Sequence, residues 1–173
     1  MRPMPATTRL LAEPLTAEAF APFGWLPVAD TDPTDAEHIL HFEWADPNLN
    51  VIAHDPDEVE HSARGAPLCD VLYRHATHTQ ALMPLDVPAV LAVAPADVTF
   101  SGPADLERVR AFELAPLDVF VLHRGTWHWG PFPLGTEAVQ LLNVQGLGYA
   151  RDNASVSLPE RTGSVLEVVA NGA

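Results

Sequence analysis

Short apolar runs separated by turn residues make up most of this chain. Seventeen prolines and ten glycines interrupt it every few residues, which leaves little room for long helices. The runs between these interruptions are rich in β-branched and aromatic side chains, a composition that favours strands. On this basis, strands are predicted at residues 9–12, 25–28, 39–43, 49–53, 69–75, 80–83, 89–94, 98–100, 109–113, 119–122, 127–129 and 139–145.

One short helix is predicted near the start of the chain. Thr16 is a good N-cap for residues 17–20, and Pro22 with Gly24 ends the turn that follows. Residues 155–169 alternate apolar and polar side chains, which fits a strand or a short docked segment. Many short strands at turn-marked spacing are typical of a barrel or a sandwich, and no repeat or linker divides the sequence. We therefore expect one mostly β domain over residues 1–173.

Residues 118–128, D-V-F-V-L-H-R-G-T-W-H, combine a strand pattern with a tight turn. Gly125 tolerates a positive φ, so the chain is predicted to turn back there and to start a new strand at His128. Trp127 and Trp129 flank this histidine and supply apolar walls. A histidine at a strand start beside two tryptophans indicates the floor of a small-molecule cavity in a β-barrel.

The net charge of the chain indicates which classes of binding partner to expect. The formal net charge is −14 and the sequence pI is near 4.7, so neither nucleic acid nor a membrane surface is expected as a partner, since both favour a basic face. All nine basic residues are arginines, which excludes a lysine Schiff base and a P-loop. An anionic substrate would need a local arginine to offset the overall repulsion.

Cysteine usage and apolar run length bear on the compartment. Cys69 is the single cysteine, so it forms no internal disulfide, and we expect a small buried residue there rather than a nucleophile. The first residues lack the apolar core of a signal peptide, and no run approaches the roughly 20 apolar residues of a spanning helix. The expectation is a cytoplasmic protein.

Two segments resemble the signatures of the cupin superfamily, whose members form a double-stranded β-helix barrel. The second signature, G-D-x-x-x-x-P-x-G-x-x-H, is matched at Asp118, Gly125 and His128. His123 stands in place of its proline and Leu117 in place of its first glycine. The resemblance implies a mostly β, cupin-type double-stranded β-helix barrel with one or two short helices.

The first cupin signature, H-x-H-x(3-4)-E, has a degraded counterpart in residues 73–86. Tyr73, His75 and Gln80 would occupy its three metal-ligand positions, and Asp86 would stand at its terminal glycine. Because side chains alternate along a strand, Tyr73 and His75 share one face and Arg74 points to the other.

The four positions that hold metal in cupins are thus Tyr73, His75, Gln80 and His128. Tyrosine stays protonated at neutral pH and glutamine offers only a neutral carbonyl, so both are poor ligands for a divalent transition metal. His78 or His123 could complete a three-histidine site if the loop bent inward. We expect no cofactor, although a divalent metal is possible. Its ligands would then be His75, Gln80, His128 and His78.

Further motifs resemble one cupin family, the ureidoglycolate lyases of purine and allantoin degradation. Residues 10–24, L-L-A-E-P-L-T-A-E-A-F-A-P-F-G, are similar to the family's P-L-[ST]-x-E-A-F-x-x-[YF]-G. Residues 74–84, R-H-A-T-H-T-Q-A-L-M-P, resemble its R-H-P-x-[GS]-[ST]-Q-x-F-I-P. R-A-F-E at 110–113 and H-R-G-T-W-H at 123–128 match its R-A-F and H-R-[GN]-x-W-H. The motifs keep one order across residues 9–130, which makes the resemblance more specific than a cupin signature alone.

The chain departs from that family's pattern at three places. Trp129 stands where the family has a second histidine after W-H, and His78 where its first motif has a glycine. The late strand ends L-L-N-V-Q-G at residues 141–146 instead of D-R-G-G, which puts Asn143 or Gln145 where a carboxylate or an arginine would be. A related small acid therefore stays open as the substrate.

The resemblance implies elimination of urea from ureidoglycolate, which leaves glyoxylate. The reaction needs a base for the hydroxyl proton, an acid for the leaving nitrogen and a cation for the carboxylate. Histidine suits the first two roles at neutral pH, and His75, His123 and His128 are the candidates. A planar guanidinium pairs well with a carboxylate, which nominates Arg124 or Arg74.

Three more residues are candidates for substrate binding. Gln80 can bond the urea amide through both its donor and its acceptor. Tyr73 and Trp127 are expected beside it. The remaining histidines lie in or next to the polar loops at residues 31–37 and 55–65 and are expected to be solvated; they are His38, His41, His54 and His61.

The sequence thus predicts a ureidoglycolate lyase-like enzyme, a carbon–nitrogen lyase that acts on a small carboxylate. A non-catalytic cupin that binds a small metabolite is one alternative. A metal-dependent cupin oxygenase or isomerase is another. Because cupins commonly pair through strand edges, the resemblance also implies a homodimer.

Overall fold

Strands are the main secondary structure in the computed structural model, which describes residues 4–27, 47–146 and 148–171. The strands are β1 (Ala6–Pro14), β2 (Gly24–Trp25), β3 (Pro47–His54), β4 (Leu68–Cys69), β5 (Val71–Arg74), β6 (Gln80–Pro84), β7 (Ala89–Ala94), β8 (Arg110–Leu114), β9 (Phe120–Leu122), β10 (Trp127–Pro133), β11 (Val139–Gly146), β12 (Ala154–Ser157) and β13 (Ser164–Val169). The helices are α1 (Ala17–Phe20) and α2 (Leu158–Thr162), with 3₁₀ turns η1 (Pro56–Glu58), η2 (Pro103–Arg108) and η3 (Tyr149–Arg151).

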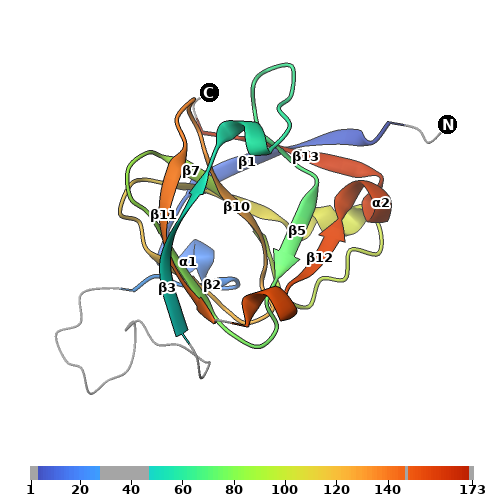
Figure 1. Cartoon of the computed structure of the whole chain (residues 1–173). Coiled ribbons are helices and arrows are strands. Elements are labelled where there is room, and N and C mark those ends of the chain that lie inside the picture. Colours follow the sequence, from blue (N-terminus) through green and yellow to red (C-terminus); the bar gives the residue numbers. More distant parts are fainter. Residues whose placement is uncertain (1–3, 28–46, 147, 172–173) are drawn as a thin grey trace.

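The strands form two sheets that curl into a barrel (Figure 1). Among the described residues, the larger sheet has the order β12-β5-β10-β7-β8-β1-β13-β4 and the smaller one β2-β9-β6-β11-β3. From β5 onward the chain crosses repeatedly between them: β6, β9 and β11 belong to the smaller sheet, and β5, β7, β8 and β10 to the larger. The predicted mostly β, cupin-type barrel with one or two short helices is confirmed.

Helix α1 closes one end of the barrel. Its N-cap is Thr16, as predicted, whose hydroxyl accepts a hydrogen bond from the Ala19 amide at 3.2 Å. Phe20 is fully buried and meets the rings of Phe112 and Phe120 edge-on, with centroids 5.4 and 5.6 Å apart. In Figure 1 the helix lies inside the ring of strands. This aromatic plug fills one part of the barrel interior and leaves the rest to a cavity.

Strand β10 lies between β5 and β7 in the larger sheet. His128 pairs across the strands with Tyr73 on one side and Val93 on the other. The tight turn that precedes β10 has Gly125 at φ +80°, as the sequence predicts. This register brings the second cupin signature, which ends at His128, next to the first, which begins at Tyr73.

Several local predictions are wrong or fall outside the described residues. Residues 98–100 form no strand, because Phe100 takes a φ of +51° that an extended chain does not allow, although Val98 and Phe100 are buried. The predicted strand 69–75 breaks at Asp70 into β4 and β5, and His75 lies just beyond β5. The tail forms two strands with helix α2 between them. The predicted strand at 39–43 and the loop at 31–37 lie outside the described residues.

Two further expectations can be compared with the fold. Cys69 is fully buried, and burial raises the pKa of its thiol, which agrees with a structural role. In the described part of the chain, no helix has the length and apolar character that crossing a membrane requires.

Candidate active site

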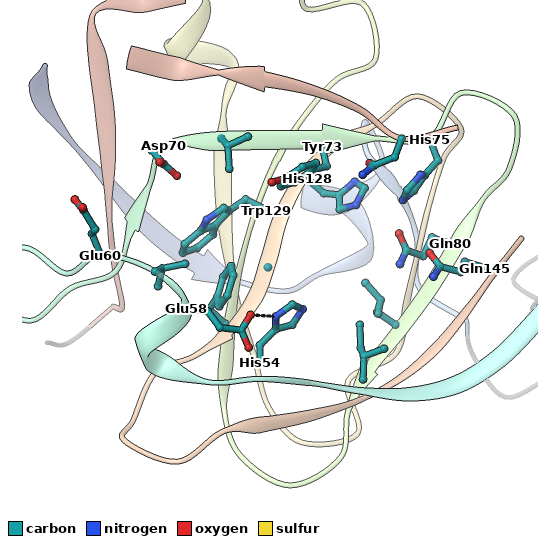
Figure 2. A pocket seen from close by; sticks show the side chains of 17 residues that line it. His54, Glu58, Glu60, Asp70, Tyr73, His75, Gln80, His128, Trp129 and Gln145 are labelled. Carbon is teal, nitrogen blue, oxygen red and sulfur yellow. Dashed lines mark hydrogen bonds and ion pairs between the residues drawn. The ribbon is translucent and has the colours of Figure 1, made fainter. Parts of the chain in front are cut away.

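A cavity of about 590 Å³, open to solvent on one side, lies between the two sheets. Tyr73, His75 and His128 line it from the strands of the larger sheet and the residue just after β5, while Gln80 and Gln145 line it from the smaller one. Figure 2 shows these five side chains gathered at one end of the cavity. The structure therefore brings together His75 and His128 from the predicted catalytic residues, and Gln80 and Tyr73 from the predicted substrate-binding ones.

Backbone contacts set the orientation of His75. The residue follows β5, and its carbonyl oxygen accepts a hydrogen bond of 2.7 Å from the Gly125 amide. Its ring Nδ1 lies 3.1 Å from the carbonyl oxygen of Asp152. Because a carbonyl only accepts, Nδ1 carries the proton and donates it. The Nε2 lone pair of His75 is then free to accept a proton or bind a cation.

The His128 ring has the same arrangement, and its exposed fraction equals that of His75. Its Nδ1 donates to the carbonyl oxygen of Thr126 at 3.1 Å, which again leaves Nε2 as the acceptor. Burial, and to a lesser degree the nearby His75 ring, lowers the pKa of His128 to about 4. Burial also lowers the pKa of His75. At neutral pH both rings are therefore neutral, with ring centroids 5.4 Å apart and basic nitrogens of defined tautomer.

A chain of side-chain amides holds Gln80 in the cavity wall. Its Nε2 donates to Asn143 Oδ1 at 2.9 Å, and Asn143 Nδ2 donates to Asn50 Oδ1 at 2.8 Å. Asn143 is fully buried and Gln80 is 7% exposed. The Oε1 atom of Gln80 has no hydrogen-bond partner among the described residues. A buried acceptor without a partner gains from a ligand that brings an N–H or O–H donor.

Asp152 anchors the loop that carries the site histidines. Its carboxylate accepts hydrogen bonds from the Ala76 amide at 3.0 Å, the Thr77 amide at 2.8 Å and the Thr77 hydroxyl at 2.6 Å. His78 Nδ1 lies 3.2 Å from the same carboxylate. Partial burial alone would raise the pKa of Asp152, but the hydrogen bonds from Thr77 and Ala76 lower it. The carboxylate is therefore ionised and bound to the loop at neutral pH.

One departure from the family pattern, His78, packs between His75 and Gly146. The His78 ring stacks on His75 with centroids 4.7 Å apart, and its other side faces Gly146. A Cβ at Gly146 would approach the His78 ring to 3.3 Å, closer than an ordinary contact. A histidine at 78 thus occupies space that a side chain at 146 would need. Burial and the neighbouring His75 lower the pKa of His78.

The donor atoms can be compared with what a metal requires. His75, His78 and Asp152 each offer one ligand atom, and these atoms lie within 4.8 Å of one another. Two imidazoles and a carboxylate suit a divalent cation such as zinc or manganese. The Asp152 carboxylate, however, already accepts three hydrogen bonds from the loop. The group fits a metal in its composition, and binding would compete with the anchoring of the loop.

The other predicted site residues lie away from the cavity. Arg74 stacks over the Trp127 ring at 4.3 Å from its centroid and donates to the Ala96 carbonyl oxygen at 3.3 Å. Arg124 is exposed on the turn before β10. His123 is also exposed and lines only a narrow crevice that shares His75, Gln80 and His128 with the cavity. Within the described ranges, no arginine lines the cavity.

Other cavity residues carried no recognised motif. His54, expected to be solvated beside a polar loop, ends β3; its side chain is 26% exposed and also lines the cavity. Glu58 and Glu60, from the segment expected to be a solvated loop, and Asp70 add three carboxylates to the lining. Trp129 forms part of the wall, as the sequence predicts. Alternation along β3 was the signal for His54, since Ile52 lines the same cavity two residues earlier.

Solved structures of similar shape include oxalate decarboxylases. One from Bacillus subtilis matches at a TM-score of 0.42 and 17% identity, covering 66% of this chain. The Lactobacillus farciminis formate complex matches at a TM-score of 0.42 and 14% identity, with the same coverage of this chain. The match spans only 24% and 27% of those two proteins.

Sequence comparison places this geometry in a family. The family model described as ureidoglycolate lyase matches residues 7–164. The chain is 36% identical over 133 residues to the ureidoglycolate lyase of a Pseudomonas fluorescens strain, covering 69% of this chain and 74% of that one. It is 34% identical over 137 residues to the ureidoglycolate lyase of a Rhodobacter capsulatus strain, covering 73% and 80%. The family model and the lyase relatives together show that this chain belongs to the ureidoglycolate lyase family.

Proposed function

We propose that this protein cleaves ureidoglycolate to glyoxylate and urea in the cavity between the two sheets. The observation that carries the proposal is the pair of neutral imidazoles, His75 and His128, whose Nε2 atoms are both proton acceptors at neutral pH. The reaction is the one after which the family is named, and in our proposal His75 or His128 is the base that takes the substrate's hydroxyl proton.

The chemistry follows from the acceptor character of the two rings. Nε2 of His75 or His128 takes the proton of the substrate hydroxyl. The oxygen lone pair then forms the carbonyl of glyoxylate as the carbon–nitrogen bond breaks. The bonding electrons leave with the urea nitrogen, which takes up a proton. At neutral pH the Nε2 atom of each ring can accept a proton but has none to donate. The base therefore comes from this wall of the cavity.

Neutral side chains supply the proposed substrate contacts. Gln80 Oε1 is placed to accept a hydrogen bond from the ureido group, because it is buried and has no partner among the described residues. Tyr73 and the amides of Gln145 and Asn153 line the same cavity and can donate to the substrate carboxylate. Arg74 and Trp127 bind each other instead, so neither belongs to the proposed contact set.

The test is release of glyoxylate and urea from ureidoglycolate by purified protein, measured with a coupled assay for each product. His128→Ala removes one of the two acceptors and should lower kcat by about 100-fold or more. His61→Gln, an exposed histidine, serves as the matched control. Product release by the wild type that does not exceed the background without enzyme would refute the proposal and favour a non-catalytic metabolite-binding cupin. Equal release above that background by the wild type and His128→Ala would refute the role of His128.

The group formed by His75, His78 and Asp152 is the observation that favours a second candidate, a metal-dependent cupin oxygenase or isomerase. We propose the metal-free lyase first, because the Asp152 oxygens are engaged by the loop. Metal analysis of the purified protein distinguishes the two. Stoichiometric iron, manganese or zinc, together with loss of activity on chelation, would put the metal-dependent candidate first.

The cytoplasmic location, the single domain and the homodimer stay predictions from the sequence. Sedimentation analysis of the purified chain checks the oligomeric state.

A further inference from the structure

A third histidine lines the cavity, from the wall opposite to His75 and His128. His54 is the last residue of β3, the edge strand of the smaller sheet, whereas His128 belongs to the larger sheet. Both residues line the same cavity. In Figure 2 His54 and Glu58 lie across the cavity from His128 and His75. The His54 ring packs against Phe132 with centroids 4.8 Å apart, which restricts its orientation.

Glu58 holds the His54 ring through a defined pair of contacts. Its Oε2 lies 2.8 Å from His54 Nδ1, and its Oε1 accepts a hydrogen bond of 2.8 Å from the Asp55 amide. The η1 turn, with Asp55 as N-cap, brings Glu58 back over the end of β3. Both oxygens of the carboxylate are therefore engaged, and the side chain is fixed relative to the histidine.

The charge state of Glu58 determines the tautomer of His54. Partial burial alone would raise the pKa of Glu58, but the hydrogen bonds from the His54 ring and the Asp55 amide lower it. An ionised carboxylate only accepts hydrogen bonds, so His54 Nδ1 is the donor. His54 Nε2 is then the atom through which the ring exchanges a proton with the cavity. When Nε2 is protonated, the ring and Glu58 form an ion pair.

The two walls therefore offer complementary chemistry. His75 and His128 present unprotonated Nε2 atoms, because each Nδ1 proton is donated to a backbone carbonyl. Neither ring can give a proton to a leaving group before it has received one. The His54 ring contacts a carboxylate and its side chain is 26% exposed, so its Nε2 can exchange protons with solvent.

We propose that His54, oriented by Glu58, donates the proton that the leaving urea nitrogen receives. This rests on the proposed lyase function. The substrate hydroxyl gives its proton to His75 or His128, the oxygen forms the carbonyl, and the carbon–nitrogen bond breaks with its electron pair going to nitrogen. The His54 Nε2 proton passes to that nitrogen, and His54 regains a proton from water. His54 is the catalytic acid, and Glu58 is a positioning residue. The other titratable groups that line the cavity are Glu60, Asp70, Tyr73, His75 and His128.

The test compares two variants with matched controls from the same segment. His54→Gln keeps polarity but cannot protonate, and Glu58→Gln keeps shape but removes the charge that supports the cation. His61→Gln and Asp57→Asn are the controls, since both residues are exposed and neither lines the cavity. We expect His54→Gln to lower kcat by about 100-fold and Glu58→Gln by about tenfold or more, with KM changed by less than about threefold.

A pH profile separates proton donation from a structural effect. The alkaline limb of the wild-type kcat profile reports the acid in the enzyme–substrate complex. It should be lost in His54→Gln and kept in both controls. Tyr73→Phe, measured in parallel, tests the rival proton donor in the cavity.

The outcomes distinguish this inference from the function on which it rests. A wild-type protein that releases no urea refutes the proposed function. An active wild type whose His54→Gln and Glu58→Gln forms keep kcat within about threefold refutes the role of His54. The role of His54 would also be refuted if Tyr73→Phe lost the alkaline limb of the kcat profile while His54→Gln kept it. Should His54→Gln fail to fold, Glu58→Gln decides, because it leaves strand β3 unchanged.

Discussion

A single backbone contact determines much of the chemistry at His128. The Thr126 carbonyl accepts its Nδ1 proton, and burial keeps the ring neutral, with a pKa of about 4. The unfolded chain has no such environment, so there the ring titrates near 6.5. The same residue therefore links the base of the proposed reaction to the stability of the fold.

The first prediction concerns the pH dependence of that stability. Between pH 6.5 and pH 4 an unfolded His128 takes up a proton that the folded one does not, so lowering the pH favours unfolding. Neutral His128 thus contributes stability that is fully present above about pH 6.5 and falls by up to about 3 kcal/mol toward about pH 4. In His128→Gln the loss of unfolding free energy between about pH 7 and about pH 4.5 should be smaller by about 1–3 kcal/mol.

Urea denaturation at the two pH values measures this difference. The comparison uses the change with pH rather than the absolute stability, because glutamine also removes the hydrogen bond to Thr126. His75 and His78 have lowered pKa values too, so part of the slope remains. His61→Gln should keep the full slope. An unchanged slope in His128→Gln would contradict the burial of a neutral ring.

Individual residues also show the limit of sequence reasoning about the site. Strand alternation correctly predicts that Tyr73 and His75 share a face, and both line the cavity together with His128. The same alternation puts Arg74 on the other face, where it stacks on Trp127. His54 was missed because its partner Glu58 lies in a 3₁₀ turn within an acidic segment, and the contact depends on how that turn folds back over β3. A pattern of residue types does not specify such a path.

At the scale of elements, the turn between β9 and β10 connects the two predicted signatures. Gly125 has a φ of +80°, and its amide donates to the carbonyl oxygen of His75. A Cβ at this position would lie 3.1 Å from the Ala96 Cβ. The turn therefore requires glycine for its backbone conformation and has little space for a side chain.

The second prediction follows from this turn. Gly125→Ala should destabilise the protein by about 1–2 kcal/mol, because alanine is strained at positive φ and crowds Ala96. Gly135→Ala is the matched control, since its Cβ would meet no atom within 4 Å. Chemical denaturation of the three proteins measures the effect. Equal stability of the two variants would show that the turn relaxes without cost.

Strands and helices were predicted correctly where the local sequence pattern alone determines the secondary structure. The apolar run at 89–94, the Thr16 cap and the strand at 139–145 agree with β7, α1 and β11. Residues 98–100 have a strand composition but are irregular, since Phe100 turns the chain with φ +51° so that its ring can pack beside Trp127 at 5.7 Å. Tertiary packing there outweighs strand propensity. The break at Asp70 likewise depends on β4 pairing with β13 while β5 pairs with β12.

At the scale of the whole molecule, charge acts against the proposed substrate. The net charge is −14, and ureidoglycolate carries a carboxylate. Glu58, Glu60 and Asp70 line the cavity, and no arginine lines it in the described part of the chain. Among the described residues, the neutral donors Tyr73, Gln145 and Asn153 are what this lining offers to an anionic substrate. The net negative charge of the sequence predicts that the protein repels an anionic substrate, and we expected an arginine in the site to offset this. The described part of the cavity lining contains no arginine.

The third prediction is that salt assists catalysis. The Debye length falls from about 30 Å at 0.01 M salt to about 8 Å at 0.15 M, so added salt screens the negative field around the cavity mouth. We expect kcat/KM for ureidoglycolate to rise by about three- to tenfold over this range through a lower KM, with kcat little changed. Steady-state kinetics in NaCl at constant pH measure it, and sucrose at equal osmolality controls for non-ionic effects. A kcat/KM that instead falls with salt would mean that a cation captures the carboxylate, and Arg124, exposed on the turn before β10, would then be the first residue to substitute.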